Sequence, residues 1–151
     1  MSKIRSILAL ALAFVMAMFI TVSSPAMAKA KAKPRTYSAE QIATIQEFSG
    51  EVNAMRDRLT ELEGLIEKED WIFMRNFVHG PFGELRSKLL FISQQLFPET
   101  RQEAQAAIKD VAAALVTIDK AGIDKDYRLA ARGYSSLVKS LDSFFSLLPS
   151  A

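Results

Sequence analysis

The sequence predicts an all-α protein, built as an up-down-up-down four-helix bundle that follows a cleaved signal peptide. From Ser38 onward, apolar residues recur at steps of three and four along nearly the whole chain, which is the spacing of amphipathic helices. Capping residues, glycine and proline interrupt this pattern at three places. Short connectors between long helices favour antiparallel neighbours. The N-terminal segment differs in character, because it has the features of an export signal.

Residues 1–28 are expected to form this signal peptide. They comprise a basic start, an apolar run from Ile7 to Val22, and an A-x-A cleavage motif that ends at Ala28. The run is shorter than the roughly 20 residues of a membrane-spanning helix, so we expect its removal after Ala28. The start contains no twin-arginine pair, which favours the general secretory route.

A basic, flexible tail at residues 29–37 is predicted to precede the bundle domain at residues 38–149. Four cations of the tail are candidates for a tether to a membrane or a partner: Lys29, Lys31, Lys33 and Arg35. From Thr36 onward, 13 basic residues face 17 acidic ones. A mildly acidic, exported domain argues against nucleic acid as a partner. The chain has no cysteine, which excludes thiolate metal sites, cysteine nucleophiles and a lipidated cysteine.

The first helix is predicted to begin at a capping box formed by Ser38 and Gln41. Its apolar stripe continues to Ile66, so we expect one uninterrupted helix. A charged turn follows, and Asp70 is the expected cap of the second helix.

The second helix is predicted to run from Trp71 to about Leu96. Its apolar stripe keeps one phase across Gly80 and Pro81, so we expect a kink at Pro81. A break, with a fresh helix starting at Pro81, is the alternative, because proline is favoured at the first helical position. Glycine inside a helix costs about 1 kcal/mol relative to alanine. Gly80 and Gly83 therefore indicate a kink, a closely crossing helix or a docked partner.

The third and fourth helices are predicted from the remaining stripes. The third starts at Pro98 or Glu99, and Gly122 is expected to close it. Asp124 is the expected cap of the fourth helix, whose stripe runs from Tyr127 to Leu148. The alanine-rich third helix should pack closely against its neighbours.

The segment from Trp71 to Arg86 is the most distinctive part of the chain, since it holds the only tryptophan and the only histidine. On a continuous helix, Arg75, His79 and Arg86 share one basic face. Arginine is enriched at binding surfaces, so Arg75 and Arg86 are the strongest predicted interface residues.

No catalytic or cofactor site can be assembled from these residues. A di-iron bundle needs Glu-x-x-His pairs, but Asn76 stands three residues before His79. The single histidine has no identifiable nucleophile for a triad, and no glycine-rich phosphate loop follows a strand. We expect no enzyme, no cofactor and no small-molecule substrate. The alternative function is an exported bundle that carries zinc or copper, with His79 as a weak candidate ligand beside carboxylates such as Glu84.

Several of these residues resemble one family. The stretch W-I-F-M-R-N-F-V-H-G-P-F-G-E-L-R, together with the later Ile118-Asp119, Tyr127-Arg128, Tyr134 and Asp142-Ser-Phe144, resembles the PsbQ family of photosystem II extrinsic proteins in its cyanobacterial form. The similarity covers about residues 37–149. It implies a four-helix protein in the thylakoid lumen, peripheral to the membrane and bound to photosystem II lumenal subunits. Such a protein supports the oxygen-evolving complex and its calcium and chloride retention without catalysis.

The resemblance and the helical pattern together give one set of candidate partner-binding residues. These are Trp71, Arg75, Asn76, His79, Gly80, Pro81, Gly83, Arg86, Tyr127, Arg128 and Tyr134. The chain departs from the family in one respect, because many cyanobacterial members have a cysteine directly after the signal peptide, where this chain has Ala28-Lys29. We therefore expect attachment through protein contacts, without a lipid anchor.

Overall fold

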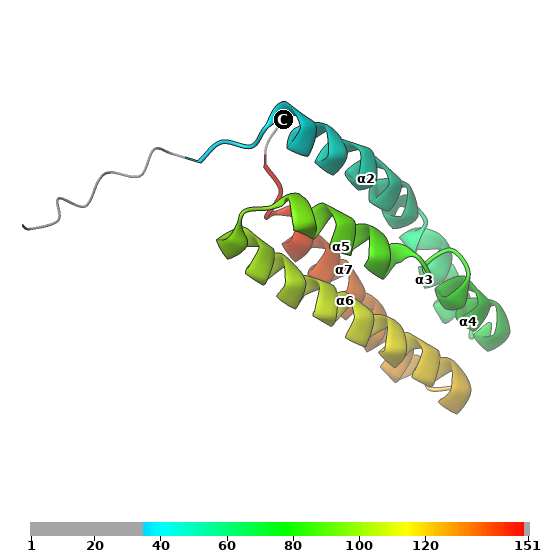
Figure 1. Cartoon of the computed structure of the whole chain (residues 1–151). Helices are drawn as coiled ribbons and strands as arrows, with labels where there is room; N and C mark the ends of the chain where they lie inside the picture. Colours follow the sequence, from blue (N-terminus) through cyan, green and yellow to red (C-terminus); the bar gives the residue numbers. More distant parts are fainter. Residues whose placement is uncertain (1–34, 150–151) are drawn as a thin grey trace, which may run out of the picture. The chain divides into compact units, whose positions relative to one another are not determined.

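The computed structural model describes residues 35–149, so the predicted signal peptide and Lys29, Lys31 and Lys33 of the predicted tail lie outside the described residues. From Tyr37 the chain forms one all-α unit. Its helices are α2 (Ala39–Asp57), α3 (Leu59–Glu67), α4 (Trp71–His79), α5 (Leu85–Gln95), α6 (Pro98–Asp124) and α7 (Tyr127–Phe145) (Figure 1). Because α2 with α3 and α4 with α5 form two interrupted rods, the unit is the predicted four-helix bundle. No helix within residues 35–149 has the length and apolar character needed to cross a membrane.

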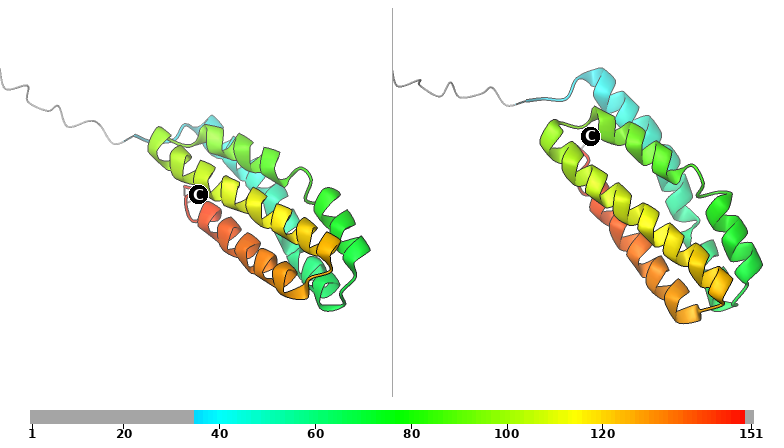
Figure 2. Two further views of the ribbon diagram at one scale, coloured as in Figure 1. Left: turned by 90° about the horizontal axis from the view of Figure 1, so that it is seen from below. Right: turned by 60° about the horizontal axis from the view of Figure 1, so that its bottom comes forward.

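The rods pack in a fixed order around the core. In the half of the bundle that holds α3 and α4, α3 contacts α4 and α7, and α6 also contacts α4 and α7. No contact joins α3 to α6 or α4 to α7. The α4/α6 side and the α3/α7 side are therefore opposite faces. In the other half, α2 packs on α5, and α5 packs on α6 (Figure 2).

The start of the first rod agrees with the prediction. The backbone N–H of Gln41 donates to Ser38 Oγ at 3.1 Å, and the backbone N–H of Ser38 donates to Gln41 Oε1 at 3.0 Å. This reciprocal pair is the capping box. It satisfies two of the backbone donors that a helix start leaves without a partner.

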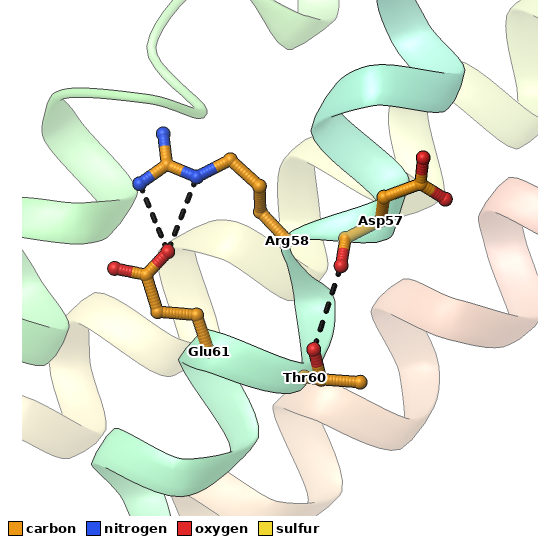
Figure 3. Close-up of polar contacts among 4 residues, drawn as sticks. All are labelled: Asp57, Arg58, Thr60 and Glu61. Carbon is orange, nitrogen blue, oxygen red and sulfur yellow. Dashed lines mark hydrogen bonds and ion pairs between the residues drawn. The ribbon is translucent and has the colours of Figure 1, made fainter.

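The prediction of a continuous first helix was wrong, because the rod is interrupted at Arg58. Thr60 Oγ1 donates to the carbonyl of Asp57 at 3.4 Å, and the Arg58 guanidinium donates to Glu61 at 2.9 and 3.1 Å (Figure 3). The same guanidinium lies 4.8 Å from the ring centroid of Phe77. The bond from Thr60 to a backbone carbonyl competes with the helical hydrogen bonds. An interruption of one residue leaves the apolar stripe in phase, so the stripe did not reveal it.

The second rod is broken, which corrects the predicted kink. α4 ends at His79, α5 begins at Leu85, and residues 80–84 form turns, visible as a loop in the green rod (Figure 2). The alternative of a fresh helix at Pro81 was also wrong. Gly83 stands where no side chain fits, because a Cβ there would lie 2.6 Å from the carbonyl oxygen of His79. The turn itself thus accounts for this glycine.

A buried aromatic side chain anchors the break between α4 and α5 to the core. Phe82 is 1% exposed, and its ring centroid lies 5.2 Å from that of Phe77. Pro81 and Arg58 line the same surface hollow. The interruptions of the two rods therefore lie side by side.

The connection between the third and fourth rods also differs from the prediction. α6 continues past Gly122 to Asp124, and Lys125 takes the left-handed conformation, with φ 54°. Asp126, instead of Asp124, caps α7 by accepting the backbone N–H three residues ahead. Asp124 pairs with Lys120 at 2.6 Å. Two aspartates two residues apart offer the same capping signal, so the pattern alone did not select the right one.

At the start of α7, the residues that face the core are one position away from the predicted ones. Ala130 and Gly133 are buried, whereas Tyr127 is exposed and Tyr134 is half-buried. A Cβ on Gly133 would lie 2.8 Å from Ile118 Cγ1. Small residues let α7 approach α6 closely here, as the alanine content of α6 suggested.

Two glycine substitutions are expected to change stability in opposite directions. Gly133→Ala should lower the free energy of unfolding by about 1–3 kcal/mol, because the new methyl group overpacks the contact with Ile118. Gly64→Ala, in α3, meets no atom within 4 Å and should raise it by about 0.5–1 kcal/mol through helix propensity. Urea unfolding of both variants measures the difference, and equal effects would contradict the close α6–α7 approach.

Candidate functional site on the α4/α6 face

α4 presents the candidate side chains because its core-facing residues are fixed. Asp70 caps the helix, since its side chain accepts the backbone N–H of Phe73 at 3.3 Å. Met74, Phe77 and Val78 are buried. Because these residues face the core, another edge of α4 faces outward, next to α6. We call this edge, together with the adjoining part of α6 and its C-terminal turn, the α4/α6 face. It contains Trp71, Ile72, Arg75, Asn76, His79, Asp119, Gly122 and Lys125.

One carboxylate organises this face. Asp119 Oδ1 lies 2.9 Å from Arg75 Nε and 2.9 Å from His79 Nε2. The Asp119 side chain is 23% exposed, against 42% for Arg75 and 64% for His79. Arg75 uses only Nε in this pair, so its two terminal nitrogens have no partner among the described residues. Those nitrogens are donors that suit a second carboxylate. We call these three residues the Asp119 cluster.

Partial burial and the two hydrogen-bonding partners, Arg75 and His79, act in opposite directions on the pKa of Asp119. Burial alone would raise the pKa of this carboxyl, but the hydrogen bonds and charges of Arg75 and His79 outweigh it and hold the pKa below its usual value. Asp119 is therefore ionised at neutral pH. It fixes Arg75 in place and orients the His79 ring.

The stem of Arg75 has a close packing partner in α6. A Cβ on Gly122 would lie 2.6 Å from Arg75 Cγ and 2.8 Å from Arg75 Cδ. The absence of a side chain at Gly122 thus makes room for the arginine. Gly122 was predicted as a helix terminator, and the structure shows that it positions Arg75 instead.

A small pocket of about 250 Å³ opens beside the cluster. It is lined by Trp71, Ile72, Arg75, Asn76, His79, Gly122 and Lys125. Two permanent cations, Arg75 and Lys125, line it together with the Asn76 amide, and no carboxylate lines it. Ile72 on α4, 73% exposed, and Ile123 on α6, 60% exposed, add apolar area to this face. Positive charge beside exposed apolar side chains suits an acidic protein surface.

The structure divides the predicted partner-binding residues into separate groups. Trp71, Arg75, Asn76 and His79 meet on the α4/α6 face. The residues of the broken segment are Gly80, Pro81 and Gly83. Arg86 is exposed on α5, makes no ion pair or side-chain hydrogen bond within residues 35–149, and does not line the pocket beside Arg75. Tyr127 and Tyr134 line a groove between α3 and α7, on the opposite side, and Arg128 is exposed on α7.

Three contributors were missed by sequence reasoning. Asp119 lies 44 residues from Arg75, and nothing in the spacing joins them before α4 is packed on α6. Gly122 and Lys125 join the site through the same packing of α4 on α6. The available signal was the combination of an acidic residue and a glycine at i and i+3 on the third helix, which places both on one side of it.

The structure places one carboxylate, that of Asp119, in contact with Nε2 of the weak metal candidate His79. Within residues 35–149, no group of three or more His, Cys, Asp or Glu residues is arranged to hold a metal ion. The geometry at His79 is therefore a hydrogen-bonded pair of side chains.

Removing the carboxylate of the cluster should cost stability in a pH-dependent way. Asp119→Asn is expected to lower the free energy of unfolding by about 1 kcal/mol at pH 7. A carboxyl with a lowered pKa stabilises the fold fully above its unfolded pKa and loses this effect as pH falls through the lower folded value, so the difference should shrink as pH falls below about 4. Urea unfolding at pH 7, 5 and 3 tests this, with Asp110→Asn on the same helix as control. A deficit that persists unchanged at pH 3 would contradict the ion-pair explanation.

Comparisons with known proteins agree with the helical architecture. Residues 4–149 match the profile of the family described as PsbQ, oxygen evolving enhancer protein 3. The chain is 34% identical over 119 residues to the protein named CyanoQ of Synechocystis sp. (strain ATCC 27184 / PCC 6803 / Kazusa), a match that covers 78% of this chain and 80% of the relative.

Proposed function

Because this chain belongs to the PsbQ family, in its cyanobacterial form, we propose that it is a non-catalytic extrinsic subunit of photosystem II on the lumenal side of the thylakoid membrane. The observation that carries this proposal is the match to the family along residues 4–149. The Asp119 cluster supports a binding role, since it joins a guanidinium, an imidazole and a carboxylate without a hydroxyl nucleophile in contact among the described residues.

The α4/α6 face is the proposed contact surface for a photosystem II subunit. Arg75 is held by Asp119 and retains free donors, and Lys125 adds a second fixed charge. A held arginine loses little conformational entropy on binding, which favours affinity. The complementary surface on the partner should carry carboxylates beside apolar side chains. Of the predicted residues, Trp71, Asn76 and His79 belong to this surface.

The effect on the oxygen-evolving complex is proposed to be indirect. A bound extrinsic subunit covers part of the lumenal surface, and so slows the exchange of calcium and chloride between the complex and the lumen. The basic tail is proposed to add weak attraction to the membrane or to the partner, through Lys29, Lys31, Lys33 and Arg35. Export to the lumen through the general secretory route is part of the same proposal.

Copurification tests the function directly. Photosystem II is purified at low salt through a tag on another subunit, and the preparation is blotted for this protein before and after a high-salt wash. We expect the protein to be present before the wash and largely lost after it, because charged contacts weaken as the Debye length shortens. Absence from the gently prepared complex would refute the proposal. Oxygen evolution at low chloride or calcium, with and without the protein rebound, tests the retention step.

A further inference from the structure

A second surface lies on the opposite side of the bundle. The groove between α3 and α7 has a volume of about 640 Å³. Its lining residues are Glu63, Ile66, Glu67, Tyr127, Ala131, Tyr134, Ser135, Val138, Lys139, Asp142 and Ser143. Since α3 contacts α7 and α4 contacts α6, this α3/α7 groove and the α4/α6 face point away from each other.

The charge of the groove is opposite to that of the pocket on the α4/α6 face. Glu63 and Glu67 stand one helical turn apart on α3, and both are exposed. Asp142 provides a third carboxylate, which already pairs with Arg56. Lys139 is the one ammonium among the lining residues. The groove thus has two carboxylates without a cationic partner among the described residues.

Aromatic and apolar groups complete the groove. Tyr134 is half-buried, and its hydroxyl donates to Glu63 Oε2 at 3.3 Å, which orients this carboxylate. Burial, and then the charge of Glu63, raise the pKa of Tyr134, so the phenol remains a neutral donor. Tyr127 is 45% exposed, and its ring has no partner within the described residues. Val138 adds an apolar side chain to the lining of the groove.

We propose that the α3/α7 groove binds a lysine- or arginine-bearing segment of a partner protein. The aliphatic stem of the basic side chain packs over Val138 and the tyrosine rings, and its cationic head lies between Glu63 and Glu67. Carboxylates beside exposed aromatic rings are the combination that attracts such a side chain through charge and cation–π contact. This inference does not depend on the proposed function. It gives the protein two oppositely charged docking surfaces, so that it can link two partners.

Hexalysine peptide serves as the probe, with hexaglutamate as its counterpart. The mature isotope-labelled protein is titrated with each peptide, and amide NMR shifts are followed. Hexalysine is expected to shift amides of the groove, around Glu63 and Tyr134, and hexaglutamate those around Arg75. The double variant Glu63→Gln/Glu67→Gln should weaken hexalysine binding by about fivefold to tenfold. The matched variant Glu40→Gln/Glu47→Gln, which removes the same charge from exposed positions on α2, should weaken it by less than about twofold.

Three outcomes would overturn the proposal. Equal losses in the two double variants would show that hexalysine binds the acidic surface without a site, as would shifts spread over all acidic residues. Groove shifts on diluting the free protein would mean that a second copy occupies the groove. Groove shifts on deleting residues 29–35, without added peptide, would assign the groove to the basic tail of the chain itself. Failure at the groove leaves the copurification result unchanged, so the two proposals are tested separately.

Discussion

Arg75→Glu is expected to release the protein from photosystem II. The substitution places a carboxylate beside Asp119 and removes the free guanidinium donors. It also changes the charged lining of the pocket on the α4/α6 face from two cations to one cation and one carboxylate. An anchoring arginine at an interface contributes about 2 kcal/mol or more, and repulsion between the new carboxylate and an acidic partner adds to the loss. We expect the Kd of the complex to rise at least about thirtyfold, so that little of the protein is retained at a concentration near the original Kd. Blotting of tagged photosystem II after reconstitution measures it.

The control is a charge reversal on the other segment of the same rod. Arg86→Glu changes the net charge equally, but Arg86 is outside the Asp119 cluster, so the Kd should rise by less than about threefold. Thermal unfolding of both proteins checks that the fold survives, since an exposed ion pair contributes about 1 kcal/mol or less. Full retention of the Arg75→Glu protein would refute the proposed face.

Phe82→Ala is expected to have the largest effect on stability. Phe82 is almost fully buried and contacts the Phe77 ring at the break between α4 and α5. Truncating a buried phenylalanine costs about 3–5 kcal/mol, which is a large part of the stability of a domain this size. Urea unfolding followed by circular dichroism measures the change.

Phe91→Ala is the matched comparison on the same rod. Phe91 is 50% exposed and stacks on Phe48 with ring centroids 5.4 Å apart. Its truncation should cost about 0.5–1.5 kcal/mol. Similar losses for the two variants would mean that Phe82 does not anchor the break.

The four rods could be predicted from the sequence because apolar period, caps and prolines agree with one another. The stripes of the first three rods, the capping box at Ser38 and the cap at Asp70 are present as expected. The interruptions could not be predicted in the same way, because they leave the stripe in phase. At Arg58 the salt bridge to Glu61 is a local contact, whereas the ring of Phe77 belongs to another rod. The contact with Phe77 is tertiary and has no local signature.

The candidate site was predictable only in part. The concentration of unusual residues from Trp71 to His79 pointed to the right helix, since Arg75 and His79 do share a surface. Arg86 does not line the pocket beside Arg75, so its place in a partner-binding surface stays a prediction. Asp119 was seen only as part of a family-like run, because its role arises when α6 packs on α4.

Within residues 35–149, the paired interruptions leave α6 and α7 as the two rods whose helices have no break along their length. α3 and α4 are joined to the rest mainly by side-chain packing, so this end is a natural unit for local opening. A partner bound across α4 and α6 spans the interrupted rod and the continuous one. Its binding free energy would then stabilise the closed state of that end of the bundle. Binding of a partner to the α4/α6 face should therefore increase the local order of α3 and α4, and release of the partner should decrease it.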